Sequence, residues 1–430
     1  LKRARLERGQ AGRPSHGALR PAGRPAQPSP AMIDAVAEPL NSTVYWLAAQ
    51  PAVHGALVGL AATSGVRAIS GAALGQEEVA PEVLLSLLLS LLFGFLSFLV
   101  FVPKARLALW SNWYFFVSRD KKCRKPDDRV PDFKGDSAKR IKIVFIRHGE
   151  SEWNAVFNVG YKVFLPFRLV RALIAEMTML FREDSLFFDA PLNKVGIQQA
   201  WDLLIFLSSQ PAGCTVEGSE KKPCAELEVQ DLVSIIRGDV GDSMICASIL
   251  KRAISTALMC LSPRLLQRPD DKVHLMTALQ ELGRNVDSLS ITPAKGTPVV
   301  PSAEGAMQKM GDLMTHFYKM RLNANRNSGN KNLGRVAKHR QEEFVKWVFE
   351  QKTDCIIVAG HSLWFREFFK SYLPKQAQHV AKTTKMVNCG VIAFDFYKDA
   401  GHHGSFFIDP KSIKEVRGGF EVKKGKEKKV

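Results

Sequence analysis

The chain has 430 residues, 46% hydrophobic and 24% charged, which is enough for one large domain with an appendage or for two domains. Its formal net charge is +18, but the excess Lys and Arg lie mainly in peripheral segments, without zinc-finger spacing or another nucleic-acid motif. Such placement suits an anionic membrane surface or a solvated tail, and we expect no nucleic-acid partner. The seven cysteines are scattered without a CxxC pair, which indicates a reducing compartment, no disulfide framework and no metal site.

The N-terminal part of the chain is expected to hold a disordered segment and then a membrane anchor. Residues 1–40 are rich in Arg, Pro, Gly and Ala, a composition typical of disorder. Translation from Met32, which would leave residues 1–31 out, is one interpretation. A membrane-anchoring region is predicted over 41–118, and its strongest part, 83–102, is uncharged and has the roughly 20 residues that a transmembrane helix needs. A buried core helix is the alternative, but such helices are seldom apolar on every face.

The orientation and number of membrane spans depend on the segments around this run. A weaker apolar stretch, 43–62, is interrupted by Gln50, Pro51 and His54, and either spans as the second arm of a hairpin or lies on the surface. Lys and Arg outnumber acidic residues from Lys104 to Arg140, which predicts a C-terminal domain facing the cytosol. Residues 119–140 are predicted to be a basic linker and 411–430 a basic tail.

From Ile141 onward, apolar runs of strand length alternate with segments of helical spacing. This alternation predicts a three-layer α/β/α domain around a mostly parallel sheet over 141–410. Val156–Phe188 is apolar and basic, and we expect a lid or a membrane-facing element there; Asn323–Gly334 is expected to be a surface loop. The predicted strands are Lys142–Ile146, Met244–Ser248, Val273–Met276, Cys355–Ala359 and Val391–Asp395.

Cationic and nucleophilic residues follow three of these strands. The first strand ends in Arg147-His148-Gly149, the second is followed by Arg252, and the third of the three, Cys355–Ala359, leads through a glycine to His361. Ligand groups gather beyond the carboxyl ends of parallel strands, so these side chains are expected to meet. Gly149 lacks a Cβ where the backbone must turn and a ligand can approach closely.

The sequence around these residues resembles the histidine phosphatase superfamily, also called phosphoglycerate mutase-like. Arg147-His148-Gly149-Glu150 matches the signature after the first strand of that family, and Ser248–Ala257 and His361 match its second and third signatures. The likeness extends from about Lys142 to about Phe396, and Asp189–Gln198 resembles the family's helix entry although Gln198 comes one residue early. The resemblance implies a phosphoglycerate mutase-like fold and phosphoryl transfer through a phosphohistidine.

Phosphoryl transfer gives these residue types a physical purpose. A neutral imidazole at His148 can attack phosphorus and hold the phosphoryl group covalently. Arg147 and Arg252 would bind the phosphoryl oxygens, and would also lower the pKa of His148. His361 would be the second donor. Because these groups supply the positive charge, neither a metal ion nor a cofactor is expected.

The general acid and base is expected to be Glu281, which lies where one branch of the family places a glutamate after Leu-x. The alternative interpretation of Glu281 is a solvent-exposed carboxylate at a helix end. In that case Glu304 and Asp189 are the next candidates for the general acid and base. Asn154 is predicted either to orient the phosphate or to cap a helix.

Two departures from the family narrow the function. His361 is followed by Ser362 and not by Asp, which argues against the acid phosphatase and phytase branch. The segment after Glu281 lacks the Arg-Tyr-Gly run and the lysine of cofactor-dependent mutases. We therefore favour a membrane-anchored phosphomonoesterase; the alternatives are a phosphoglycerate mutase-type phosphotransferase and a catalytically inactive phosphate-binding interaction module. Its partners would be the membrane, through 83–102, and a phosphorylated small molecule, lipid headgroup or phosphoprotein.

Overall fold

The described part of the chain comprises most of the predicted domain and one long N-terminal helix. A computed structural model describes residues 56, 59–60, 62–63, 66, 81–121, 123–126, 139–158, 161–211, 221–307, 310–334, 336–399 and 405–421. The predictions for 1–40, for nearly all of 43–62 and for the last nine residues of the tail lie outside these residues.

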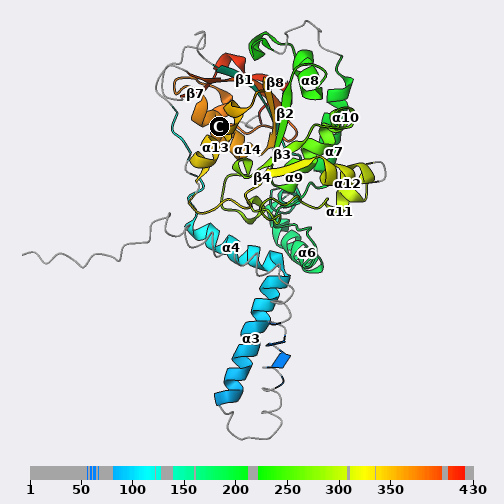
Figure 1. Cartoon of the computed structure of the whole chain (residues 1–430), viewed down its shortest axis with the longest axis vertical. Coiled ribbons are helices and arrows are strands. Elements are labelled where there is room, and N and C mark those ends of the chain that lie inside the picture. The colour runs from blue at the N-terminus through cyan, green and yellow to red at the C-terminus, as the bar shows by residue number, and fades with distance from the viewer. Residues whose placement is uncertain are drawn as a thin grey trace, which may run out of the picture.

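A single mixed sheet forms the centre of the domain (Figure 1). Its strands are β1 (Lys139–Arg147), β2 (Ser243–Ser248), β3 (Val273–Met276), β4 (Leu322–Arg326), β5 (Cys355–Gly360), β6 (Val391–Lys398), β7 (Phe406–Ile408) and β8 (Lys414–Arg417). The order is β4-β3-β2-β5-β1-β6-β7, with β8 also on β6. The five strands from β4 to β1 pair in parallel, whereas β6 is antiparallel to β1, β7 and β8.

Helices cover both faces of this sheet. The α-helices of the described residues, of which α3 extends away from the sheet (Figure 1), are α3 (Pro81–Phe101), α4 (Pro103–Val117), α5 (Glu152–Phe157), α6 (Leu165–Thr178), α7 (Lys194–Ser209), α8 (Val229–Arg237), α9 (Lys251–Cys260), α10 (Ser262–Gln267), α11 (Ser302–Gly305), α12 (Gly311–Met320), α13 (Ala337–Glu350) and α14 (Ser362–Tyr372).

The pleat of β1 shows how the layers form. Val144 and Ile146 join a core cluster with side chains of α7, α8, α9 and α12, whereas Ile143 and Phe145 join a second cluster with α13 and α14. Successive side chains of a strand point to opposite faces, so a continuous apolar run places residues in both cores. The predicted α/β architecture with a mostly parallel sheet is confirmed.

Three local predictions were wrong. Residues 323–326, expected in a surface loop, belong to the edge strand β4, whose polar sequence lacks the apolar run by which the inner strands were recognised. The helical spacing of 254–266 and of 303–320 predicts one helix in each segment. The first is interrupted at Leu261, between α9 and α10, and the second is broken between α11 and α12. A Cβ on Gly311 would overlap the Gly305 carbonyl oxygen, so the glycine permits the close packing of α12 on α11.

The predicted anchor, 83–102, coincides with α3 up to Phe101. Val102 leaves the helical conformation (φ −115°, ψ 89°), and Pro103 begins α4. Within the described residues, no helix by itself has the length and apolar composition required to cross a bilayer. Leu84–Leu99 and Pro103–Val117 meet these criteria only as a pair, which is bent by 95°.

Residues on both sides of the predicted domain, 141–410, make contacts with it. Asp120, expected in the linker 119–140, is buried and forms ion pairs with Lys331 and Arg340. The predicted tail 411–430 contributes β8, and Phe420 forms a bridge with Met386. Both flanking segments are basic overall, and this composition conceals the individual residues that are buried against the sheet.

Candidate active site

The loop after β1 is held by contacts to three other elements. The amide of His148 donates to the Gly360 carbonyl at the end of β5 (3.0 Å), and the amide of Gly149 donates to Thr256 Oγ1 on α9 (3.1 Å). A Cβ on Gly149 would lie 2.5 Å from the Gly196 carbonyl oxygen at the start of α7. The glycine therefore permits close backbone packing on α7, a structural need beyond the turn that we predicted.

The two predicted histidines lie side by side. His148 and His361 have ring centroids 5.0 Å apart, and both side chains are buried. Nδ1 of His148 is 2.5 Å from the Gly149 carbonyl and donates to it, which leaves Nε2 with its lone pair. Nε2 of His361 is 2.8 Å from Ser248 Oγ at the end of β2. The carboxyl ends of adjacent strands thus bring the two imidazoles together, as the strand pattern predicted.

Arg147 is oriented by the C-terminal segment. Its Nη1 donates to the Met386 carbonyl and lies 2.8 Å from Glu421 Oε1. The Arg147 side chain is largely buried, whereas that of Glu421 is 47% exposed. The candidate phosphate-binding guanidinium therefore already faces a carboxylate.

Arg252, the second candidate cation, extends from the first turn of α9. It is buried, and its Nη1 donates to the Asp287 backbone carbonyl (2.9 Å) while Nη2 lies 3.4 Å from Asp287 Oδ2. These contacts occupy one side of the guanidinium. Arg252 also acts electrostatically on both histidines and on Glu281, so the predicted groups form one cluster.

The cluster determines the charge of its own imidazoles. Burial, followed by the nearby charges of Arg252 and Arg147, holds the pKa of His148 well below its usual value. Burial and Arg252 likewise lower the pKa of His361. Both rings are therefore neutral at pH 7, the state that a nucleophile requires.

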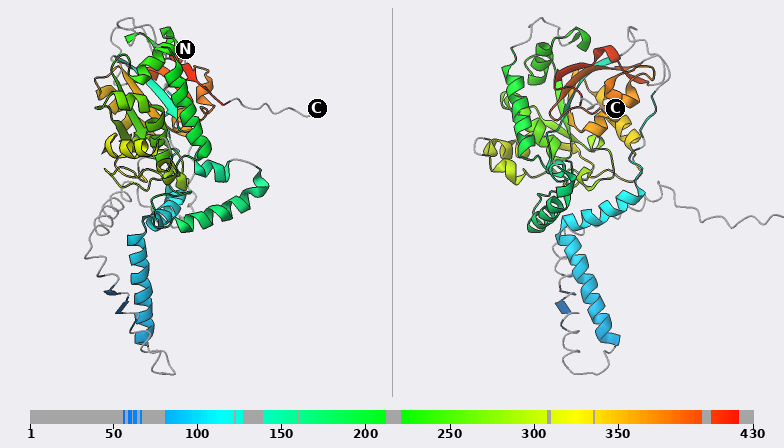
Figure 2. Two further views of the ribbon diagram at one scale, coloured as in Figure 1. Left: turned by 90° about the vertical axis from the view of Figure 1, so that its right-hand side faces the viewer. Right: turned by 180° about the vertical axis from the view of Figure 1, so that it is seen from behind.

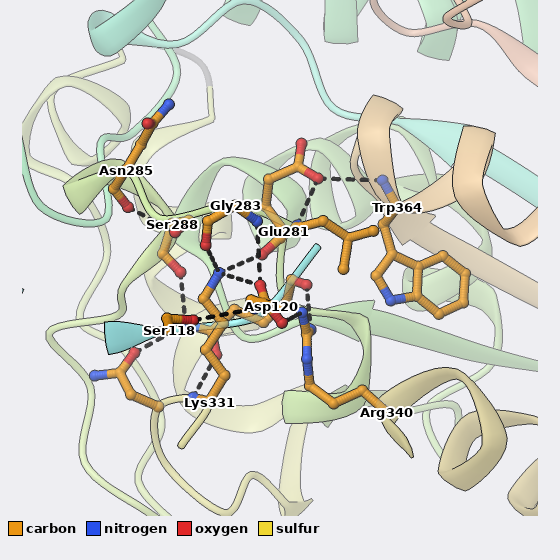
Figure 3. Close-up of polar contacts among 12 residues, drawn as sticks. Ser118, Asp120, Glu281, Gly283, Asn285, Ser288, Lys331, Arg340 and Trp364 are labelled. Atoms are coloured by element: carbon orange, nitrogen blue, oxygen red, sulfur yellow. Dashed lines mark hydrogen bonds and ion pairs between the residues drawn. The ribbon is translucent and has the colours of Figure 1, made fainter. Parts of the chain in front are cut away.

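The side chain of Glu281 contacts the first turn of α14. Its Oε1 accepts from the amides of Leu282 (2.8 Å) and Trp364 (3.2 Å), so the carboxyl group is directed to a helix N-terminus (Figure 3). Burial raises the pKa of Glu281, and Arg252 opposes this shift. A raised pKa favours the protonated form, from which a carboxyl group can donate a proton.

An ionic network fixes the loop that carries Glu281. Lys331 Nζ donates to the backbone carbonyls of Glu281 (2.6 Å) and Gly283 (2.8 Å) and to Asp120 Oδ2 (2.9 Å). Asp120 accepts in addition from the Gly283 amide (3.1 Å) and from Arg340 Nη2 (2.7 Å). Figure 3 shows these contacts converging below Glu281. The segment that follows α4 is thereby joined to the candidate acid.

Two other predicted residues have contacts of a structural kind. Asn154 Oδ1 accepts from Asn158 (2.7 Å), and the Asn154 amide donates to Ser151 Oγ at the start of α5. Asp189 accepts from the Lys251 amide (2.7 Å) and from Ser290 Oγ (2.7 Å). No described contact brings Asn154 to the histidines, and Asp189 orients the helix that carries Arg252.

Glu304, the other alternative candidate for the general acid and base, is fully buried, and this burial raises its pKa to about 8. It acts electrostatically on Lys251 and lies beside Ser255, both on α9. Within the described ranges, no three His, Cys, Asp or Glu side chains are placed to share a metal ion.

Sequence reasoning missed three residues that bond the cluster. Ser248 lies inside the matched motif, so its position could have been found, but its contact with His361 could not. Asp287 follows Glu281 by six residues without a recognisable pattern. Glu421 belongs to a basic segment, and only the pairing of the C-terminal residues with 385–387 brings it to Arg147.

Comparison with known proteins gives structural likenesses. No protein-family model and no curated protein matches the chain. A mutant of phosphoserine phosphatase from Entamoeba histolytica is 15% identical, with 65% of this chain and 98% of that one covered and a TM-score of 0.29. A mycobacterial glucosyl-3-phosphoglycerate phosphatase is 13% identical, with 63% of this chain and 97% of that one covered and a TM-score of 0.29. Both are histidine phosphatase superfamily members. At this identity and score, activity must be inferred from the site of the chain itself.

Proposed function

We propose that the chain is a phosphomonoesterase that works through a phosphohistidine at His148. One observation carries the proposal: two neutral imidazoles with ring centroids 5.0 Å apart lie beside two guanidiniums at the carboxyl ends of adjacent strands. Two buried cations beside two uncharged histidines suit a dianionic group, whose charge the guanidiniums neutralise and whose phosphorus the free imidazole nitrogen can attack.

In the first proposed step, the lone pair of His148 Nε2 forms a bond to phosphorus while the bond to the leaving oxygen breaks. Glu281, whose pKa is raised by burial, gives its proton to that oxygen, and an alcohol leaves. Arg147 exchanges Glu421 for the phosphoryl oxygens, and Arg252 uses the side not held by Asp287. Nδ1 of His361, for which the described residues offer no hydrogen-bond partner, is the atom available to the phosphoryl group.

In the second proposed step, the Glu281 carboxylate takes a proton from water while the water oxygen bonds to phosphorus. The bond from phosphorus to nitrogen breaks, its electron pair returns to His148, and inorganic phosphate leaves. The proposed chemistry is independent of metal ions because guanidinium and imidazole groups supply the positive charge. We further propose that α3 inserts into a membrane and that the catalytic domain faces the cytosol.

The test is a hydrolysis assay of the full-length chain in detergent against a panel of phosphomonoesters. We expect phosphate release that His148→Ala reduces on the order of a thousandfold or more, because the nucleophile is lost. His339→Ala, which removes an exposed histidine, is the matched control and should leave the rate unchanged. Acid quenching during turnover should trap phosphate on the parent protein and not on His148→Ala.

Other outcomes identify the alternatives. Return of the trapped phosphate to a second position of the substrate, without release, would indicate a mutase-type phosphotransferase. A folded protein that binds phosphate and hydrolyses no ester would indicate an inactive interaction module. Equal rates for the parent and His148→Ala would refute the proposed mechanism.

A further inference from the structure

The outer face of α6 is apolar although it is exposed. Phe167 is 75% exposed, Ile174 63% and Met177 69%, whereas Ala172 is the buried residue of this helix. Exposed positions at spacings of three and four form one stripe along a helix. A soluble surface normally presents its polar face to water, so this helix has the reverse arrangement. The stripe consists of Phe167, Val170, Leu173, Ile174, Met177 and, just beyond the helix, Phe181.

Helix α4 carries a second exposed apolar group, and a buried lysine joins it to α6. Lys104 Nζ bonds Glu176 Oε1 (3.0 Å), the Met179 carbonyl (2.7 Å) and the Asp184 carbonyl, so the start of α4 is fixed at the end of α6. The contact satisfies helix C-terminal carbonyls with a cation. The exposed large apolar side chains of α4 are Leu109, Trp113, Phe115 and Phe116.

The direction of α3 relates this surface to a bilayer. Helices α3 and α4 meet at 95°, and Figure 2 shows α4 and α6 at the base of the domain, lying across the direction of α3. If α3 enters a membrane along its normal, α4 and α6 lie in the plane of the headgroups. Aromatic and apolar side chains beside arginines are typical of helices in that plane.

The charges of the surface fit an anionic bilayer. Arg171 on α6 and Arg182, just beyond it, are exposed, as are Arg119 and Lys121 after α4. The single acidic residue of α6, Glu176, is paired with Lys104. Basic residues around an apolar patch are attracted to acidic lipids.

The same surface is continuous with the edge of the sheet that carries the candidate site. Arg284 donates to the Phe115 carbonyl at the end of α4 (3.2 Å), three residues beyond Glu281. Lys251, which precedes Arg252, donates to the Glu183 carbonyl after α6 (2.8 Å). The segments on both sides of the site are therefore attached to α4 and α6.

We propose that α4 and α6 together form a membrane-docking surface that lies on an anionic bilayer and presents the site to phosphate carried on lipid headgroups. The choice of substrate class rests on the proposed function, whereas the docking does not. The partner that covers this surface is the headgroup layer of the bilayer that α3 enters. The bend between α3 and α4 and the exposed basic residues suit that layer.

Spin labels test the docking without reference to activity. The full-length protein is reconstituted into vesicles of phosphatidylcholine with 30% phosphatidylserine, about the anionic content of a cytosolic leaflet, and labelled at Val170→Cys or Met177→Cys. The control is Gln230→Cys, exposed on α8 at the other end of the domain. We expect the α6 labels to collide preferentially with oxygen and the control label with a water-soluble nickel complex. Equal nickel accessibility at the three positions would overturn the docking, as would dipolar broadening showing that a second copy covers the patch.

A paired assay tests the substrate class. Phe167→Glu with Ile174→Glu should lower hydrolysis of a diacylglycerol phosphate in these vesicles about tenfold, since docking is weakened, and leave hydrolysis of soluble p-nitrophenyl phosphate unchanged. Equal loss on both substrates, or no loss on either, would refute the lipid assignment. If the parent hydrolyses neither substrate, the proposed function fails and the lipid assignment fails with it, while the spin labels still decide the docking.

Discussion

The hydrogen bond from Nδ1 of His148 to the Gly149 carbonyl fixes the tautomer of the imidazole that we infer to be the nucleophile. An imidazole with an ordinary pKa would lose half of its reactive form at about pH 6.5. Here burial and two arginines lower the pKa of this ring. The cluster therefore acts on its nucleophile even before a substrate binds.

The first prediction concerns pH. Hydrolysis should persist as the pH falls through 6.5, because His148 and His361 remain neutral in the folded protein. The measurement is kcat/KM between pH 5 and 8. In Arg252→Gln, which removes one of the charges that lower both pKa values, the decline on the acidic side should move to higher pH, whatever the size of the overall loss. An unmoved decline would contradict this account.

The same pKa values affect stability in a defined direction. Below pH about 6.5 the unfolded chain binds protons on these histidines that the folded chain does not, so unfolding is favoured as the pH falls. The stability that the fold gains from keeping His148 and His361 neutral is therefore fully present above pH about 6.5. Acid sensitivity of the fold and acid tolerance of the reaction thus have one cause.

A second prediction concerns Glu421, whose carboxylate lies 2.8 Å from Arg147 Nη1. A substrate phosphate must compete with this carboxylate, and its negative charge also repels the dianion. Glu421→Gln should therefore lower KM by about three- to tenfold, an effect expected of one removed charge contact, with a smaller change in kcat. The matched control is Glu415→Gln, an exposed residue of β8. Equal effects of both variants would indicate a general change in charge.

At the scale of elements, the inner strands could be predicted from the sequence, whereas the edge strand β4 and the pairing of the C-terminal segment could not. Apolar runs marked β1, β2, β3, β5 and β6 because both faces of these strands are buried. The edge strand β4 has no such run, and its sequence, Leu-Asn-Ala-Asn-Arg, resembles a loop. The strand ends likewise brought His148 and His361 together in the prediction, whereas Glu421 reaches Arg147 through a pairing that local sequence does not specify.

The third prediction concerns Asp120, which joins the end of α4 to the Glu281 loop (Figure 3). Although burial alone would raise it, the pKa of Asp120 is lowered by Lys331 and Arg340. Asp120→Asn leaves both cations without their buried counter-charge and should cost about 3 kcal/mol or more of unfolding free energy. Denaturant titration measures this loss, and Asp270→Asn on an exposed loop is the control.

A double variant separates charge from packing. In Asp120→Asn with Lys331→Met, one uncompensated cation is removed, and part of the lost stability should return. If Asp120→Asn proves as stable as the parent, the network does not hold the loop. A loss of kcat in excess of the loss of folded protein would show that the position of Glu281 depends on Asp120.

For the whole molecule, the α/β domain makes contacts across the linker boundary that composition suggests, with the end of the preceding helix α4. The predicted linker 119–140 is charged and contains two prolines, features typical of a flexible connection. Yet Ser118 and Asp120 are buried, and Arg284 bonds the Phe115 carbonyl. The average composition of the segment 119–140 therefore did not indicate that one of its carboxylates, that of Asp120, is buried.

The last prediction follows from this boundary. A fragment that begins at Lys139 lacks α4 and Asp120, so Lys331 and Arg340 remain buried without their partner. A fragment that begins at Pro103 keeps both. In the same detergent, the shorter fragment should unfold at a lower denaturant concentration, with a deficit of about 3 kcal/mol or more, and should hydrolyse phosphoesters more slowly because the Glu281 loop is released. Coincident unfolding curves would show that the sheet supports this loop without α4. The expected difference would instead show that the segment from α4 to Asp120, nearest the proposed membrane, also supports the loop of the candidate acid Glu281.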